Sequence, residues 1–163
     1  MWYIVELTLH SYQPGGSSGF NGDSDPLSNG KACMRDAAIM QRLGVRLLPN
    51  PFPYCGLLIF LAQVNTIRVY NLSPALVHDE CASIFNAAGI HMIIDVNSPL
   101  PGGALDRTDP AKSYNPAYFH QVYGVIESFK NYPNTLAFFS GNEVINEQSH
   151  KSVPAYIRVC YHQ

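Results

Sequence analysis

The sequence is poor in charged residues and has no strong excess of either sign. Aspartate, glutamate, lysine and arginine make up 13% of the 163 residues, and the formal net charge is −2 at pH 7. Such a composition offers no basic patch for a phosphate backbone, so nucleic acid is not expected as a partner. The longest apolar run, Cys55 to Ala62, is far shorter than the roughly 20 residues that span a bilayer. The first residues also lack the basic stretch and cleavage site of a signal peptide.

Several chemical signatures are missing as well. The four cysteines have no Cys-x-x-Cys or Cys/His spacing, so they indicate no metal site. No glycine-rich phosphate loop follows the first strand-like segment, which disfavours a nucleotide-binding fold. No serine nucleophile elbow is present. Tyrosine, in contrast, is abundant at 10 residues. Many aromatic and few charged side chains fit a protein that handles neutral polar ligands.

Strand-like and helix-like segments alternate along the chain. Runs of β-branched, aromatic and aliphatic residues predict strands over 3–10, 64–70, 90–96 and 136–140. Apolar residues at helical spacing predict helices over 33–43, 78–88 and 116–132, and a further helix from Val153 onward. This alternation is typical of a parallel α/β sheet, which is either doubly wound or part of a (β/α)8 barrel.

Polar residues lie at the end of each predicted strand, and this recurrence favours the barrel. They are Tyr12-Gln13, Tyr70-Asn71, Asp95 to Asn97 and Asn142-Glu143. The functional side chains of a (β/α)8 barrel lie at the carboxyl ends of its strands. Four βα units supply half of the eight strands, so residues 1–163 are interpreted as the N-terminal half of a (β/α)8 TIM barrel with an open sheet edge.

Glu143 is the leading candidate for chemistry. It stands just after an apolar strand, in Phe138-Phe139-Ser140-Gly141-Asn142-Glu143. A carboxyl group beside an apolar wall is kept protonated by desolvation, as a general acid requires. Asn142 is suited to hydrogen-bond a sugar hydroxyl in the transition state. The alternative interpretation is a loop glutamate that caps a following helix.

Three further residues are candidate ligand contacts, each with a structural alternative. Asp95 can fix a substrate hydroxyl, or pair with Arg68 in the barrel interior. Tyr70 can stack on a sugar ring, or be an ordinary core aromatic. Gln13 can bind a hydroxyl, or bond its own Pro-Gly turn. The histidines are interpreted as surface or helix-end residues rather than metal ligands: His78, His91, His120 and His150.

A set of motifs in sequence order carries a family resemblance. It comprises Tyr12-Gln13-Pro14-Gly15-Gly16, Asp25-Pro26-Leu27, Cys33-Met34-Arg35-Asp36, Asn65-Thr66-Ile67-Arg68-Val69-Tyr70, His78-Asp79-Glu80-Cys81 and Phe138-Phe139-Ser140-Gly141-Asn142-Glu143-Val144-Ile145-Asn146. From about Tyr12 to Arg158 the chain closely resembles glycoside hydrolase family 72, the fungal β-1,3-glucanosyltransferases.

The resemblance implies a retaining enzyme that cleaves an internal β-1,3-glucan bond and passes the new end to another glucan chain. Glucan is then both donor and acceptor, and no metal or cofactor is needed. The resemblance implies Glu143 as the acid/base. It also implies substrate contacts and a disulfide at these positions: Gln13, Tyr70, Asp95 and Asn142, and Cys33 with Cys81.

Retention also requires a second carboxylate ~5–5.5 Å from the first, as nucleophile. In the family it lies on a later strand, so this chain is expected to lack it. Glu127 falls within a predicted helix and Glu147 in a loop, and both are poor substitutes. The chain by itself is therefore expected to be inactive. The alternatives are a catalytically inactive glucan-binding fragment and another retaining barrel glycosidase.

The resemblance further implies secretion, and a place at the cell surface through a glycolipid (GPI) anchor or in the cell wall. Membrane contact would occur only through that anchor, and no signal for either address is visible in the sequence. The family also runs directly from Leu-Gly into Val-Asn-Thr, whereas here the 19 residues of 45–63 intervene. Codons for Val45-Arg46 and Gln63 can match splice signals. Residues 45–63 are therefore interpreted as an inserted segment, either a translated intron or a surface loop.

Overall fold

The computed structural model describes residues 9–14, 25–42, 64–141 and 151–160, and its elements follow the predicted order. They are β1 (Leu9–Tyr12), α1 (Gly30–Arg42), β2 (Thr66–Val69), α2 (Asp79–Ala87), β3 (His91–Asp95), α3 (Pro110–Ser113), α4 (Pro116–Phe129), β4 (Thr135–Phe139) and α5 (Val153–Cys160). The boundaries differ from the sequence interpretation by a few residues: β1 continues to Tyr12, past the predicted end at His10, and α1 begins at Gly30, before the predicted start at Cys33. The short helix α3 was not predicted. None of the described helices is long and apolar enough to cross a membrane.

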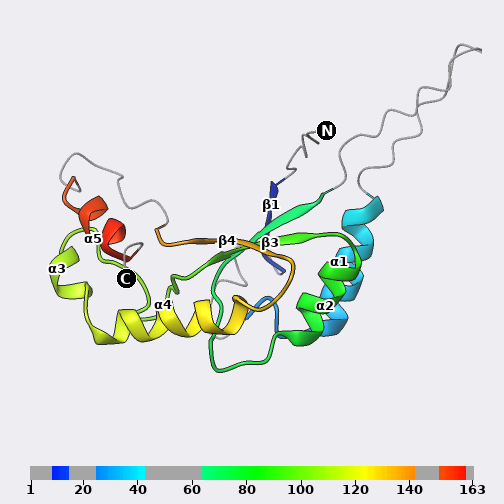
Figure 1. Cartoon of the computed structure of the whole chain (residues 1–163), viewed down its shortest axis with the longest axis horizontal. Helices are drawn as coiled ribbons and strands as arrows, with labels where there is room; N and C mark the ends of the chain where they lie inside the picture. Colours follow the sequence, from blue (N-terminus) through cyan, green and yellow to red (C-terminus); the bar gives the residue numbers. More distant parts are fainter. Residues whose placement is uncertain (1–8, 15–24, 43–63, 142–150, 161–163) are drawn as a thin grey trace, which may run out of the picture.

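The four strands form one parallel sheet in the order β1-β2-β3-β4. The helices α1, α2 and α4 lie on one side of it (Figure 1). A doubly wound sheet reverses its strand order and carries helices on both faces. The sequential order of the described strands therefore confirms the partial (β/α)8 barrel, whose interior corresponds to the face opposite the helices.

The hydrophobic core fills the space between the sheet and these helices. Alternate residues of β2 and β3 are completely buried there: Ile67, Val69, Met92 and Ile94. The helices contribute Phe85, Val125 and Phe129, which are also completely buried. Each such side chain contributes about 1.5–3 kcal/mol. Because strand side chains alternate between the two faces, Arg68, Tyr70 and Asp95 face the barrel interior.

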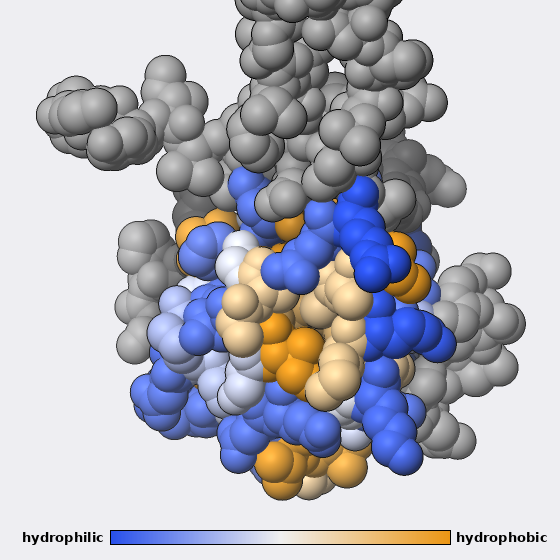
Figure 2. Space-filling model, turned by 90° about the vertical axis from the view of Figure 1, so that its right-hand side faces the viewer, coloured by the Kyte–Doolittle hydropathy of each residue, from blue (hydrophilic) through white to orange (hydrophobic). Residues whose placement is uncertain are grey.

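A disulfide joins the first two helices on the outer side of the barrel. Cys33 of α1 and Cys81 of α2 are bonded and completely buried, which confirms the pairing that the family resemblance implied. Figure 2 views the molecule from the end at which α1 and α2 lie, and shows a small hydrophobic area surrounded by hydrophilic side chains. Met34 and Ile39 of α1 are among the exposed large hydrophobic residues.

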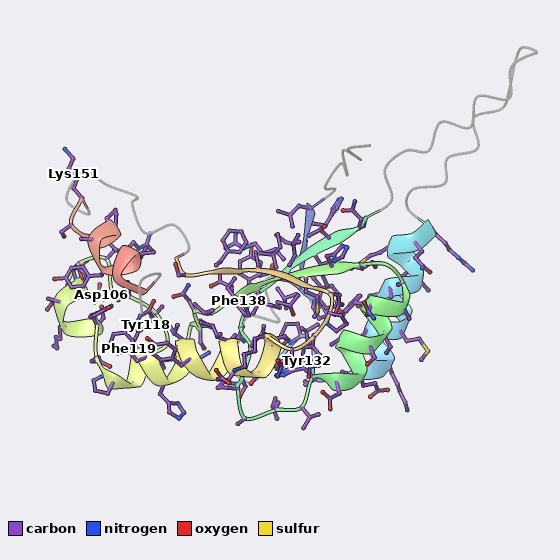
Figure 3. The ribbon with its side chains drawn as sticks, viewed as in Figure 1. Asp106, Tyr118, Phe119, Tyr132, Phe138 and Lys151 are labelled. Carbon is purple, nitrogen blue, oxygen red and sulfur yellow. A yellow bond between two sulfur atoms is a disulfide. The ribbon has the colours of Figure 1, made fainter. Side chains whose placement is uncertain are left out.

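The β4 strand contains an irregularity that reverses the orientation of its last residues. Met92 pairs with Thr135, yet the next residue, Ile93, pairs with Ala137, so Leu136 is an extra residue on β4. Such a bulge exchanges the two faces for every residue that follows it. Phe138 consequently packs between β4 and α4 (Figure 3). Phe139, paired with Asp95, faces the barrel interior.

Candidate active site at the carboxyl ends of the strands

The parallel register brings the predicted site residues to one edge of the sheet. Tyr12 pairs with Val69, Val69 with Ile94, and Asp95 with Phe139, so the four strands end side by side. Gln13 follows β1 and is exposed, Tyr70 follows β2 and is half-buried, and Asp95 is the last residue of β3. Asn142 and Glu143 come three and four residues after β4 ends, and lie outside the described residues.

Asp95 is engaged by two neighbours at this edge. Arg68 donates from Nη2 to Asp95 Oδ2 at 3.1 Å. Asn97 donates to Asp95 Oδ1 from its backbone N–H at 3.0 Å and from Nδ2 at 2.7 Å. The side chain of Asp95 is only 2% exposed. The interior ion pair that the sequence left open is thus present, and a direct contact from Asp95 to substrate stays a prediction.

Two aromatic rings hold the guanidinium of Arg68. Its Cζ lies 4.3 Å from the centroid of the Tyr70 ring and 4.3 Å from that of Phe139. A guanidinium within about 6 Å of a ring centroid is attracted by the negative face of the ring. The Tyr70 hydroxyl also lies 3.3 Å from Ser11 Oγ of β1. Tyr70 is therefore fixed from two sides while remaining partly open to solvent.

A second polar cluster, not foreseen as a unit, fixes the loops outside the sheet. Asp25 Oδ2 lies 2.8 Å from His78 Nε2 and accepts from the Ser73 N–H at 2.8 Å, while Oδ1 accepts from the Leu27 N–H at 2.8 Å. His78 directly precedes α2, as a helix-end residue should, but it is 1% exposed rather than on the surface. No local sequence pattern indicated that His78 is buried, because its partner Asp25 lies 53 residues away in the sequence.

Tyr12 connects the end of β1 to α1. Its hydroxyl donates to Asp36 Oδ2 at 3.0 Å, and its ring meets Phe85 edge-on. Burial, together with the nearby charge of Asp36, raises the pKa of the Tyr12 hydroxyl above its ordinary value. Tyr12 therefore stays neutral and supports the rim of the sheet. Across the described ranges, no three His, Cys, Asp or Glu side chains are grouped so that they could hold a metal ion.

A family model described as glucanosyltransferase, for glycoside hydrolase family 72, matches residues 57–163. The chain belongs to this family. The family 72 chain is 67% identical over 147 residues to the 1,3-β-glucanosyltransferase gel2 of Aspergillus fumigatus, which covers 90% of this chain and 27% of gel2. It is 49% identical to the probable 1,3-β-glucanosyltransferase GAS3 of Saccharomyces cerevisiae, with 90% of this chain and 25% of GAS3 covered.

Solved structures agree with this assignment. The family 72 chain superimposes on S. cerevisiae Gas2p in complex with laminaritriose and laminaritetraose with a TM-score of 0.73 and 26% identity. The superposition covers 96% of this chain and 30% of Gas2p. These findings confirm the family and the barrel fold predicted from the motifs. The chain spans about a quarter of the length of the curated relatives it matches.

Proposed function

We propose that this chain forms the N-terminal part of the catalytic barrel of a retaining β-1,3-glucanosyltransferase. The reaction cleaves an internal β-1,3-glucan bond and joins the new end to a second glucan chain. The observation that carries the proposal is the shared edge of the sheet. In a chain of family 72, Gln13, Tyr70 and Asp95 directly follow or end three adjacent parallel strands, and β4 leads to Asn142 and Glu143. Relatives named 1,3-β-glucanosyltransferases support the substrate class.

The proposed roles follow from the chemistry of each side chain. Glu143 protonates the leaving oxygen and later deprotonates the incoming sugar hydroxyl. Asn142, Asp95 and Gln13 offer hydrogen bonds to sugar hydroxyls, and Tyr70 presents an aromatic ring that has a polar hydroxyl. The preceding strand supports the role of Glu143, because its last residue, Phe139, presents an apolar ring to the barrel interior.

The second carboxylate of a retaining reaction is proposed to come from a strand outside this chain. Glu127 and Glu80 are poor candidates within the described part, because both lie on helices that cover the outer side of the sheet. The side chain of Glu127 is 66% exposed and pairs with Lys130 at 2.6 Å. Neither carboxylate faces the interior surface that carries Asp95 and Tyr70.

The test uses a chimera in which residues 1–163 are followed by the part of gel2 beyond the matched region. We expect the chimera to convert laminari-oligosaccharides into longer products, and Glu143→Gln to reduce this transfer at least about 100-fold, because the proton donor is lost. Glu127→Gln is the matched control and should leave transfer unchanged. A folded Glu143→Gln chimera that transfers at the parental rate contradicts the assignment of the acid/base.

The second candidate function is a catalytically inactive glucan-binding fragment. It is favoured by the placement of Glu80 and Glu127 on helices outside the sheet, because neither of these described carboxylates can act as a nucleophile at the strand ends. Without a nucleophile the covalent intermediate cannot form, so the 163-residue chain alone should give no longer products. If the chain alone made longer products, the proposal that its nucleophile comes from outside the chain would be wrong. Hydrolysis without transfer by the chimera would instead favour another type of retaining barrel glycosidase.

We also propose that residues 45–63 are an inserted segment, which lies outside the described residues. The described chain is consistent with this assignment, because α1 ends at Arg42 and β2 begins at Thr66, so the segment falls within the connection from one βα unit to the next. The Gln41 side chain already reaches the Ala88 carbonyl at 3.2 Å. Sequencing the transcript decides the origin of the segment, since a message that retains its codons excludes a translated intron.

The cellular location is proposed from the same family relationship. A buried disulfide between Cys33 and Cys81 is typical of proteins that fold in an oxidising compartment, which supports secretion. Attachment to the cell surface by a GPI anchor, residence in the cell wall and glycosylation are proposed for the whole protein. Release of the protein from fungal membranes by a GPI-specific phospholipase would support the anchor, and retention after that treatment would contradict it.

A further inference from the structure

The Arg68 side chain lies beneath the proposed site and contacts two aromatic rings and a carboxylate. Arg68 lies on β2 and faces the barrel interior, where its side chain is 19% exposed. Its guanidinium lies between the rings of Tyr70 and Phe139, and it forms an ion pair with Asp95. Ion pair and rings together leave the side chain little freedom to rotate, because each contact constrains a different part of the same planar group.

The three partners of Arg68 come from the ends of three adjacent strands. Tyr70 directly follows β2, while Asp95 and Phe139 are the last residues of β3 and β4. The bulge at Leu136 is what brings Phe139, rather than Phe138, to the interior face. One side chain therefore links the three strand ends from which the proposed contacts Tyr70 and Asp95 and the segment leading to Glu143 extend.

We propose that Arg68 is a positioning residue for glucan transfer, a role that rests on the proposed function. It acts through its neighbours and not on the substrate. The cation holds the Tyr70 ring in place for the sugar, keeps Asp95 oriented with Asn97, and anchors the end of β4. A displacement of about 1 Å at a catalytic site can cost roughly 100-fold in rate. A residue that fixes two proposed substrate contacts and the end of the strand leading to Glu143 should therefore have a large effect on catalysis.

A purely structural role makes a different prediction from a positioning role. If Arg68 only stabilises the fold, its removal lowers the unfolding temperature, and activity measured well below that temperature stays near the parental value. If Arg68 positions the site, the folded variant is slow, and a free guanidinium ion that enters the space left between the two rings restores activity. Asp95 and the negative faces of the rings remain in the variant to bind that ion.

The experiment measures transfer by the chimera and its Arg68→Ala variant with laminari-oligosaccharides, together with thermal unfolding of each. We expect Arg68→Ala to lower kcat/KM at least about 30-fold while remaining folded, in line with a displacement of site groups by less than 1 Å. Millimolar guanidinium chloride should recover activity at least about fivefold in a saturable manner, whereas urea, which is flat but neutral, should not. Arg68→Lys should recover little, because an ammonium ion cannot fill the flat space between two rings.

Arg35→Ala is the matched control. Arg35 also pairs with an aspartate, Asp36, at 2.7 Å, but it is 65% exposed and lies on α1 outside the barrel. This variant should transfer at the parental rate and show no gain from guanidinium. If Arg68→Ala does not fold, Arg68→Ser, which also leaves the space between the rings open, replaces it with the same expectations.

Each outcome bears on one of the two proposals. A folded Arg68 variant that keeps more than about a third of parental activity, or whose loss guanidinium does not reduce, overturns the role of Arg68 while the parent still transfers. A parental chimera that is folded but makes no longer products overturns the proposed function, and the role of Arg68 with it.

Discussion

Asp25 and His78 meet at 2.8 Å although they are 53 residues apart in the sequence. Both side chains are almost completely buried, and His78 also packs against the Phe129 ring, with 4.6 Å between ring centroids. The contact joins the turn before α1, the loop before α2 and the end of α4. It therefore closes the outer loops of the half-barrel around one carboxylate.

Replacing Asp25 by alanine should lower the free energy of unfolding by about 3 kcal/mol, because a buried imidazole and two backbone N–H groups lose their acceptor. Urea unfolding followed by circular dichroism measures the change. The control is Glu127→Ala, which removes an exposed ion pair of similar length and should cost less than about 1 kcal/mol. Equal changes in the free energy of unfolding would show that the buried Asp25 cluster stabilises the fold no more than an exposed ion pair does.

Removing the Cys33–Cys81 disulfide by a double substitution to serine should cost about 4 kcal/mol, since the bond closes a loop of 48 residues in the unfolded chain. Denaturant unfolding of the parent and of the double variant measures this difference in the free energy of unfolding. Cys160→Ser serves as control and should leave the cross-link in place, as judged by counting thiols that alkylate under denaturing conditions. A double variant as stable as the parent would mean that native-state strain offsets the entropic gain.

Deleting residues 45–63 should leave the cross-link and the fold intact. The loop closed by the disulfide becomes shorter, and the expected change in its entropic contribution is only about 0.5 kcal/mol. Thiol counting and urea unfolding of the deletion variant test this expectation. Loss of the disulfide or of cooperative unfolding would instead assign the segment a structural role.

The stability of the chain should fall between pH 10 and about 12. Partial burial and a bond of 2.6 Å to Asp79 raise the pKa of the Tyr132 hydroxyl from 10.0 to about 12, and Tyr132 lies just past α4, beside the start of α2 (Figure 3). The neutral hydroxyl is favoured in the folded state, so its contribution is full below pH 10 and is lost as pH rises through the folded pKa.

Spectrophotometric titration of tyrosinate checks this behaviour. The difference between the parent and Tyr132→Phe should be a single group that titrates near pH 12. The same substitution should flatten the alkaline fall in stability. A difference titration centred near pH 10, the ordinary value for tyrosine, would show that Tyr132 is not held by Asp79 in solution.

Local sequence patterns were sufficient for most of the fold and insufficient for parts of the site. Apolar periodicity and the closing glycines located the long helices; Gly89, for example, has φ +71° and ends α2 with a bond from the Ile90 N–H to the Phe85 carbonyl at 2.9 Å. The helix α3 has four residues, too few for a periodic signal, and depends on the Asp109 side chain accepting from the Lys112 N–H.

In the candidate site, too, some contacts could be anticipated from the sequence and others could not. Alternation along β2 and β3 was enough to anticipate that Arg68 and Asp95 could meet, because both point inward on neighbouring strands. The contact between Arg68 and Phe139 depends on the bulge in β4, and a one-residue shift in register is a tertiary effect without a local pattern. The pairing of Asp25 with His78 likewise needs the assembled loops.

Asn71 shows how the folded loops restrict enzymatic modification. Asn71-Leu72-Ser73 has the acceptor sequence for N-linked glycans. The asparagine is 8% exposed, adopts a left-handed backbone with φ 57°, and borders a cavity of about 300 Å³ shared with Ser98 and Gln121. An oligosaccharyltransferase could reach this amide only before the loop closes, and a branched glycan there would keep the loop from closing. In the folded chain the residues of this acceptor triplet line the cavity, and Asn71 is too buried to accept a glycan.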